Sequence, residues 1–338
     1  MTQPTIKSIQ NLSKEEIDGF LRKEFPIKKA AFLINHGEWL HRGNENRFVL
    51  VLNKKIIGYF GIIPFKVHWK EELKESFWWT DLIISENYRG RGYQSIVDKH
   101  VCSRPELKLG FPNKIAAKIH QKHHWKIFDH IKVLMFPIKP SKSSLFNKRY
   151  PIIGLTLDLL IAPLINVRRK SVSKWSYREK TPRFNKYVQL FNAARAGQIS
   201  IKKDLDYFNW RYLKSPYRDD YEYYLCHKPN DNQIVLILRK IKTKFGLKVR
   251  IVDMFGNLED LKAVKDIINF VIFRAIKKNA NQITIMQSHQ SLHRLLFSIG
   301  FIIFSKARLC LSSENNYQID QKEMMSWSLS DSDNDFSD

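Results

Sequence analysis

Cysteine, glycine and proline are scarce in this sequence of 338 residues, which has three cysteines, 13 glycines and 12 prolines. Cys102, Cys226 and Cys310 are far apart and odd in number, which excludes a disulfide framework and the spacing of a zinc site. The low glycine and proline content excludes a largely disordered chain. We therefore expect a folded protein in a reducing, cytoplasmic setting.

The sequence also lacks segments that direct a chain into or across a membrane. Residues 1–5 have neither the charged nor the apolar part of a signal peptide, and no apolar run reaches the length of about eighteen residues that spans a bilayer. A shorter apolar stretch, 152–165, precedes three basic residues at 168–170. It predicts either a linker helix between domains or an amphipathic segment on an anionic membrane surface.

Acidic residues are few, since 57 Lys and Arg stand against 33 Asp and Glu, for a net charge of +24. This excess favours an anionic partner such as coenzyme phosphates, nucleic acid or an acidic membrane, although a generally basic proteome has the same effect. Five acids and no basic residue occur in Glu323–Asp338. Asp331–Asp335 resembles the spacing of a metal-binding loop but lacks its glycine and distal glutamate. This end is predicted to be a solvated tail, or a segment that folds back to hold a cationic acceptor.

Helix and strand patterns alternate along residues 1–138, which predicts an α/β domain. A capping box, Ser13 with Glu16, opens the first helix. Further helices are expected at Gln94–Ser103 and Asn113–His124. Strands are expected at Phe48–Leu52, Ile56–Ile63, Phe77–Ile84, Leu107–Phe111 and Val133–Pro137.

Residues 139–186 differ in character, with twelve basic and two acidic residues, and are predicted to form a linker. The α/β pattern resumes over 187–312, and 313–338 is predicted to be an acidic tail. The order strand, strand, helix, strand, helix, strand repeats that of the first half, which indicates an internal duplication. The repeat is expected at Ile234–Leu238, Val249–Met254, Asp260–Lys277, Ile283–Met286, His289–Ser298 and Gly300–Phe304.

The segment Leu82–Ser95 combines the end of a buried strand, a turn that contains Gly90 and Gly92, and the start of a helix. That order directs free backbone N–H groups and the positive end of a helix dipole to one point, where a pyrophosphate fits. Arg89 and Arg91 add positive charge. An ordinary strand-to-helix turn is the alternative interpretation.

This turn resembles the acetyl-CoA motif of the GNAT (GCN5-related N-acetyltransferase) superfamily, Gln/Arg-x-x-Gly-x-Gly/Ala. Arg89 takes its first position and Gly92 its fourth, whereas Gln94 stands where the family has Gly or Ala. The Gln94 side chain would either crowd the phosphates or bond them through its amide. The resemblance implies a mixed α/β fold that binds acetyl-CoA, as acyl donor, through Ile83, Ile84, Arg89, Gly90, Arg91, Gly92, Tyr93, Gln94, Ser95 and Asn113.

A second family motif, Asn-x-x-Ala-x-x-x-Tyr-x-x-x-Gly-Phe, is matched in spacing by the stretch from Asn113 to Trp125. Asn113 and Ala116 agree with it. His120 stands where the family's tyrosine protonates the departing thiolate, and His124 and Trp125 replace Gly and Phe. The resemblance therefore implies that His120 is the general acid; a helix-face histidine without a role is the alternative.

The second half resembles the family more weakly, at Asp206–Pro216 and at Leu292–Phe301. The loop Met254–Asp260 lacks the arginine and the glycine pair, and Leu296 stands in the place of the tyrosine. The expected fold is therefore a tandem GNAT-like acyltransferase with a CoA-competent N-terminal lobe. Its C-terminal lobe is interpreted as a degenerate copy that shapes the acceptor site.

Catalysis in this family is direct attack of an amine on the thioester. Asp81 is the candidate general base, or an electrostatic anchor for the ammonium group, with a solvated strand acid as the alternative. The cluster His120, His123 and His124 superficially resembles a zinc motif, but Gln121 replaces the glutamate that would act as the base. We therefore predict no metal.

The sequence thus predicts an N-acyltransferase, most simply an acetyltransferase, that acts on a small or sugar-linked amine. By resemblance to two-lobed bacterial proteins, an amino sugar of a surface-polysaccharide pathway is the preferred acceptor. The alternatives are a transferase that uses aminoacyl-tRNA and a CoA-binding protein without catalysis. Nucleic acid is otherwise not expected as a partner, peripheral membrane association is possible, and no obligate protein partner is deduced.

Overall fold

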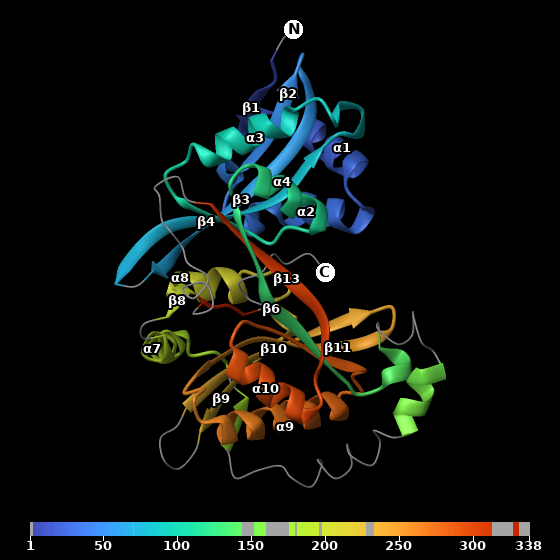
Figure 1. The fold of residues 1–338 in the computed structure, drawn as a ribbon, viewed down its shortest axis with the longest axis vertical. Coiled ribbons are helices and arrows are strands. Elements are labelled where there is room, and N and C mark those ends of the chain that lie inside the picture. Colours follow the sequence, from blue (N-terminus) through green and yellow to red (C-terminus); the bar gives the residue numbers. More distant parts are fainter. Residues whose placement is uncertain are drawn as a thin grey trace.

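The computed structural model describes residues 3–69, 71–143, 152–159, 176–179, 181–195, 198–227, 233–312 and 327–330. They form two lobes stacked along the long axis of the molecule and joined by long strands (Figure 1). Both lobes combine helices with one mixed sheet that continues from one lobe into the other. Among the described residues, no helix is long and apolar enough to cross a membrane.

The N-terminal lobe has the strands and helices in which the sequence pattern alternates. Its helices are α1 (Lys14–Glu24), α2 (Ile27–Leu40), α3 (Tyr93–Cys102) and α4 (Lys114–Lys122). The predicted capping box opens α1, because Ser13 and Glu16 bond each other's backbone N–H groups. The strands are β1 (Thr5–Ser8), β2 (Arg47–Leu52), β3 (Lys55–Trp69), β4 (Glu72–Ile84), β5 (Leu107–Gly110) and β6 (Lys126–Pro137).

Alternation along β4 distributes its apolar side chains to both faces of the sheet, as expected for a central strand. Trp78 packs in the core under α1 and α2, whereas Trp79 packs in the core under α3. The β3–β4 pairing shifts register between Tyr59 and Gly61, so β4 contains a bulge at its carboxyl end. Asp81, with φ of 58°, lies in this bulge.

The C-terminal lobe repeats this order of elements. Helices α9 (Leu261–Lys277) and α10 (Gln290–Ile299) pack in one core, while α7 (Phe184–Ala194) and α8 (Leu205–Phe208) pack in another on the opposite side. A π-helical turn, Asn209–Leu213, follows α8. The strands are β7 (Ser176–Glu179), β8 (Ile199–Ile201), β9 (Tyr221–His227), β10 (Gln233–Thr243), β11 (Gly246–Gly256), β12 (Gln282–Gln287), β13 (Ile302–Ser312) and β14 (Trp327–Ser328).

The two lobes exchange strands at the centre of the sheet, where the order is β5-β13-β6-β12. The end of β13, Cys310–Ser312, pairs with β5 in the N-terminal lobe. The carboxyl half of β6, Lys132–Pro137, pairs with β12 in the C-terminal lobe. Each lobe is therefore completed by a strand from the other half of the chain (Figure 1).

Side-chain contacts also join the lobes through α2. The indole N–H of Trp39 donates to the Trp210 carbonyl at 2.9 Å, and the indole N–H of Trp210 donates to the Trp39 carbonyl at 2.7 Å. Phe32 stacks on Tyr217 with ring planes 4° apart. These contacts fix α2 against the segment that follows α8.

Some predicted elements differ in extent from the observed ones. Strand β6 begins at Lys126 rather than Val133, and β13 continues to Ser312 rather than ending at Phe304, because both pair with two neighbours along their length. Of the apolar stretch 152–165, residues 152–159 are helical and the rest lie outside the described residues. Most of the predicted acidic tail, 313–326 and 331–338, also lies outside them.

Candidate active site

The central feature of the N-terminal lobe is a cleft between β4 and β5. These parallel strands pair only from Ser76 with Leu107 to Trp78 with Leu109, and they then diverge. A cavity of about 910 Å³ opens beyond this point. Past Trp78, the edge of β4 that faces β5 has no ladder partner in the described part of the chain, so its backbone groups are available to an extended ligand.

The predicted phosphate loop forms the upper wall of this cleft. Gly90 and Gly92 have φ of 74° and 78°, a conformation that favours glycine, and Gly92 precedes the first turn of α3. No side chain caps α3, and the residues of its first turn, Tyr93, Gln94 and Ser95, line the cleft. The first N–H groups of a helix have no partner within it and are available to a ligand. Arg89 donates from Nε to the Ile84 carbonyl at 2.9 Å, which ties the loop to the end of β4.

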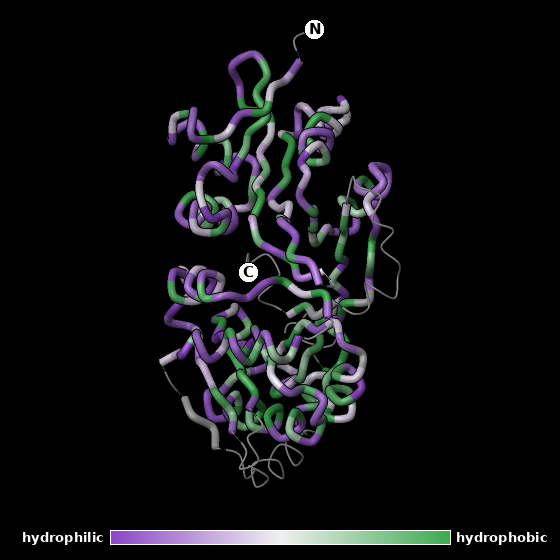
Figure 2. Tube along the Cα trace, turned by 90° about the vertical axis from the view of Figure 1, so that its left-hand side faces the viewer, coloured by the Kyte–Doolittle hydropathy of each residue, from purple (hydrophilic) through white to green (hydrophobic). Residues whose placement is uncertain are grey.

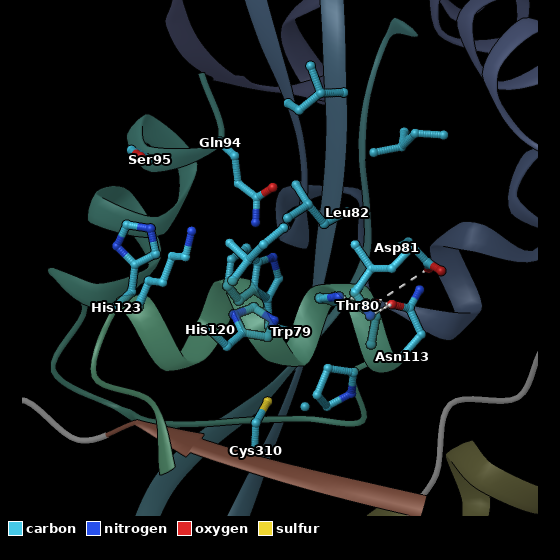
Figure 3. A pocket seen from close by; sticks show the side chains of 18 of the residues that line it. Trp79, Thr80, Asp81, Leu82, Gln94, Ser95, Asn113, His120, His123 and Cys310 are labelled. Carbon is cyan, nitrogen blue, oxygen red and sulfur yellow. Dashed lines mark hydrogen bonds between the residues drawn. The ribbon is translucent and has the colours of Figure 1, made fainter. Parts of the chain in front are cut away.

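The other residues predicted to bind the coenzyme lie around the same cavity. Gln94 extends its amide into the cavity toward Leu82, whereas Ser95 lies at its edge (Figure 3). The guanidinium group of Arg91 lies over the Tyr88 ring at 5.5 Å and is not a cavity-lining group. The remaining predicted residues that line the cavity are Ile83, Ile84, Arg89, Gly90, Gly92, Tyr93 and Asn113.

Asn113 has a structural task in this wall. Its Oδ1 accepts hydrogen bonds from the backbone N–H groups of Ile115 at 3.0 Å and Ala116 at 2.9 Å. It is therefore the N-cap of α4, the helix that the sequence predicts from this residue onward. Through this cap, it fixes the helix on which His120 lies.

His120 lies in the wall of the cavity, where its ring packs between Trp79 and Trp125 with both ring centroids 4.9 Å away. Burial, together with the nearby charge of His123, lowers the pKa of His120 to about 4. Its Nδ1 is buried without a hydrogen-bond partner among the described residues. His120 is therefore neutral near pH 7 and retains an unused ring nitrogen in the wall of the cleft.

Asp81 lies in the bulge of β4, where its carboxylate is almost fully buried. Lys29 from α2 lies 2.6 Å from Oδ1, and Nε2 of His41 lies 3.4 Å from Oδ2. Burial raises the pKa of Asp81, but the interactions with His41 and with the charge of Lys29 outweigh it and lower the pKa to about 2. Such a carboxylate accepts a proton poorly at neutral pH, which argues against the predicted general base. Its cation is Lys29 of the protein itself.

Several residues of the cleft were not singled out for it by the sequence. Cys310 reaches the cavity from β13, because the strand exchange brings this strand next to β5. Trp79 and Lys122 also line it. Trp79 lies in the predicted apolar strand and Lys122 on the predicted helix, whereas the position of Cys310 depends on tertiary pairing.

The histidine cluster is divided between two environments. His120 packs between tryptophans, whereas Nε2 of His123 lies 3.3 Å from the buried carboxylate of Asp98 on α3. Burial raises the pKa of Asp98 to about 6, although the charge of His123 opposes this. The described residues contain no group of three side chains placed to hold a metal ion.

The corresponding region of the C-terminal lobe is built differently. A cavity of about 540 Å³ lies beside the loop Gly256–Glu259. However, the Asp260 carboxylate caps α9 by accepting from the Ala263 N–H at 2.9 Å. A carboxylate at the helix N-terminus occupies the position that a phosphate would need and repels it.

The chain itself fills the space where β11 and β12 diverge. Their pairing ends at Ile251 with Ile285, and Ser330 from the C-terminal segment lies beyond, bridged to Gln287. The Ser330 hydroxyl donates to Asp253 at 2.5 Å. An open cleft of the kind between β4 and β5 is therefore replaced here by a packed segment.

Comparison with known proteins identifies the fold. No family model and no curated protein sequence matches the chain. In structure it is similar to a GCN5-related N-acetyltransferase from Anabaena variabilis, with 13% identity over 91% of this chain and 72% of the other and a TM-score of 0.60. It is also similar to Saccharomyces cerevisiae N-myristoyltransferase with bound myristoyl-CoA, with 11% identity over 92% and 82% and a TM-score of 0.62.

A third similar structure is a probable N-acyltransferase from Enterococcus faecalis, with 9% identity over 92% and 72% of the two chains and a TM-score of 0.59. These likenesses extend over both lobes. They confirm the predicted fold class, a mixed α/β architecture of the GNAT type.

Proposed function

We propose that the protein is an N-acyltransferase that moves an acyl group from acyl-CoA to an amine. The observation that supports this best is the cleft between β4 and β5, which leads directly to the uncapped N-terminus of α3. An extended pantetheine fits an unpaired strand edge, and a pyrophosphate fits a helix N-terminus. Proteins of this fold include N-acetyltransferases and an N-myristoyltransferase with bound myristoyl-CoA, which agrees with such a donor.

The reaction is a direct transfer in the cleft. The amine nitrogen attacks the thioester carbonyl, a C–N bond forms, the C–S bond breaks, and the proton lost by nitrogen ends on the sulfur. We assign His120 to the departing thiolate; because its ring is neutral, it contributes a hydrogen bond from N–H. Asp81, paired with Lys29, contributes by fixing the bulge of β4 against α2.

We further propose acetyl-CoA as the donor and an amino sugar as the acceptor. The rings of Trp79, His120 and Trp125 fill the space beside the cleft, which favours a short acyl group. The net charge of +24 suits sugar nucleotides and lipid-linked sugars, because both have diphosphates. Because the loop before α3 fits the pyrophosphate of CoA, CoA can deliver the acyl group, and aminoacyl-tRNA is not needed as a donor.

Titration calorimetry with CoA tests the donor site. We expect one site per chain. Gln94→Glu should weaken binding strongly, because it adds a negative charge beside the phosphates, yet an acid at a helix N-terminus should not destabilise the fold. Gly92→Glu should abolish CoA binding. Because the φ of 78° at this position strains any residue other than glycine, the melting temperature of this variant shows whether the protein still folds.

The matched control is Asn257→Glu, which makes the same charge change in the corresponding loop of the C-terminal lobe. It should leave CoA binding unchanged. A Gln94→Glu variant that binds CoA like the wild type would contradict the assignment, as would loss of the site in Asn257→Glu.

A second candidate, transfer from aminoacyl-tRNA, is favoured by the basic surface alone. It requires many phosphate contacts and hence a steep fall of affinity with salt. Acetyl-CoA turnover on a panel of amino sugars, beside tRNA binding at low and physiological salt, separates the two. Tight tRNA binding that weakens steeply with salt, without turnover of acetyl-CoA, would contradict our proposal and favour transfer from aminoacyl-tRNA. Binding of CoA without turnover of any amine would favour a CoA-sensing protein.

A further inference from the structure

The short helix over residues 152–159 exposes large apolar side chains to solvent. Its exposed large apolar residues, with the exposed fraction of each, are Ile152 at 78%, Ile153 at 51%, Leu155 at 61% and Leu159 at 78%. At 100° per residue, three of them, Ile152, Leu155 and Leu159, lie within one stripe. A surface helix normally buries that stripe.

The inward side of this helix is attached to the C-terminal lobe through one polar side chain, Asp158. The Asp158 carboxylate accepts hydrogen bonds from the Ser141 N–H at 3.1 Å and from the Ser141 hydroxyl. Gly154 is buried on the same side. Thr156, which shares the outer face, donates its hydroxyl to the Ile152 carbonyl at 3.2 Å and so satisfies its own polar group. The outward position of the apolar face is therefore determined by hydrogen bonds.

Basic side chains lie near the base of this helix, because Lys142 directly follows Ser141, whose N–H donates to Asp158 of the helix. Asn281 donates to the carbonyls of Lys142 and Phe245, which brings the end of the β10–β11 hairpin beside the segment that leads to the helix. Lys142, Lys242 and Lys244 are exposed there. In Figure 1 the helix projects from the C-terminal lobe on the same side as this hairpin, away from the N-terminal lobe.

We propose that this basic-apolar corner, formed by Ile152, Ile153, Leu155, Leu159 and the lysines 142, 242 and 244, binds an anionic membrane surface. The apolar stripe enters the boundary between headgroups and acyl chains, while the ammonium groups contact lipid phosphates. Anionic lipid is the occupant that satisfies both parts of the corner, because a second copy of this basic face would repel it. Binding here leaves the cleft between β4 and β5 open, since the two lie on different lobes.

Co-sedimentation of the full chain with vesicles tests this proposal. We expect binding to phosphatidylcholine vesicles that contain about one third phosphatidylglycerol, little binding to pure phosphatidylcholine, and weakening as salt shortens the Debye length below about 10 Å. Leu155→Gln with Leu159→Gln should reduce the partition coefficient at least about tenfold, because two apolar side chains are lost from the bilayer. Lys242→Gln with Lys244→Gln should reduce it and flatten its salt dependence.

The matched control is Ile27→Gln, because Ile27 is 88% exposed but lies on α2 of the other lobe. It should bind vesicles like the wild type. Equal binding to neutral and anionic vesicles, or binding to neither, would overturn the proposal. So would light scattering that shows a dimer which Leu155→Gln with Leu159→Gln dissociates, since a second copy would then cover the face.

Discussion

At the scale of single residues, His120 is the side chain on which the proposed chemistry depends most. We expect His120→Ala to lower kcat by roughly 10²-fold, as is typical when a hydrogen-bond donor to a developing negative charge is removed. The control is His124→Asn, an exposed neighbour whose φ of 64° asparagine tolerates. Steady-state kinetics with the true acceptor measures kcat for both variants. If His120→Ala has the same kcat as His124→Asn, His120 does not assist the reaction, and positioning of the substrates alone is the mechanism.

The pH dependence of stability gives an independent test of the His120 environment. Burial, aided by the charge of His123, lowers the pKa of His120 from 6.5 to about 4, so the unfolded chain binds more protons between these values. Its contribution to stability is therefore present above pH 6.5 and is lost as the pH falls through about 4. The free energy of unfolding, measured by urea titration at several pH values, should not show this loss in His120→Asn. If wild type and variant have the same pH dependence, the His120 ring is not buried in solution.

The Asp81 carboxylate gives a second prediction at this scale. Lys29→Met removes the cation 2.6 Å from a buried anion and should reduce the free energy of unfolding by about 3–5 kcal/mol. Lys28→Met, one position along α2 and exposed, should change it by less than about 0.5 kcal/mol. Adding Asp81→Asn, which tolerates the φ of 58° and removes the charge, to Lys29→Met should recover part of the loss. Failure to do so would mean that the two side chains are not coupled.

Sequence patterns identify the loop residues but not the contacts that set their chemistry. Gly90, Gly92 and Asn113 have the backbone and capping functions that local spacing predicts, because these depend on neighbours within three residues. The ion pair of Asp81 with Lys29 joins α2 to β4, and no local pattern records it. Its consequence, a carboxylate with a depressed pKa, was therefore not predictable.

At the scale of elements, the C-terminal segment is held by one buried ion pair. Lys203 lies 2.7 Å from Asp253 and donates to the Ser330 hydroxyl at 2.9 Å. Tyr212 donates to the other carboxylate oxygen at 2.5 Å. This network joins β11 to the segment that contains β14.

Lys203→Met should therefore destabilise the protein by about 3–5 kcal/mol, because it leaves a buried carboxylate without its cation. The adjacent Lys202 pairs with Asp204 at the surface, so Lys202→Met should have an effect below about 1 kcal/mol. Urea unfolding measures both, and limited proteolysis should release the C-terminal segment in Lys203→Met only. Equal stability of the two variants would contradict this account of the network.

The predicted elements agree best with the structure where periodicity and local caps determine them. Strands β2 and β5, helices α3, α4, α9 and α10, and the order of elements in both halves follow from the sequence. Strands β3 and β4 form a longer hairpin than predicted, since β3 continues to Trp69 rather than Ile63 and β4 begins at Glu72 rather than Phe77. The lengths of β6 and β13 do not, because they depend on pairing across the lobes. The division into residues 1–138, 139–186, 187–312 and 313–338 stays a prediction.

At the scale of the whole molecule, strand exchange makes each lobe depend on the other. Residues 1–138 expressed alone should lack a cooperative thermal transition and should not bind CoA, because β5 would lose its neighbour β13. Co-expression with residues 139–338 should restore both properties in a complex that co-purifies. Circular dichroism and calorimetry measure the outcome, and a CoA-binding, cooperatively melting 1–138 fragment would refute the dependence.

The same strand order has a consequence during synthesis on the ribosome. Strand β5 ends at Gly110, but its neighbour β13 begins only at Ile302. At about 5–20 residues per second, roughly ten to forty seconds pass between their appearances. During that time the edge of β5 is open to pairing with other nascent chains. We therefore expect slower translation between these strands to increase aggregation, and a chaperone that covers extended segments to raise the yield of active protein.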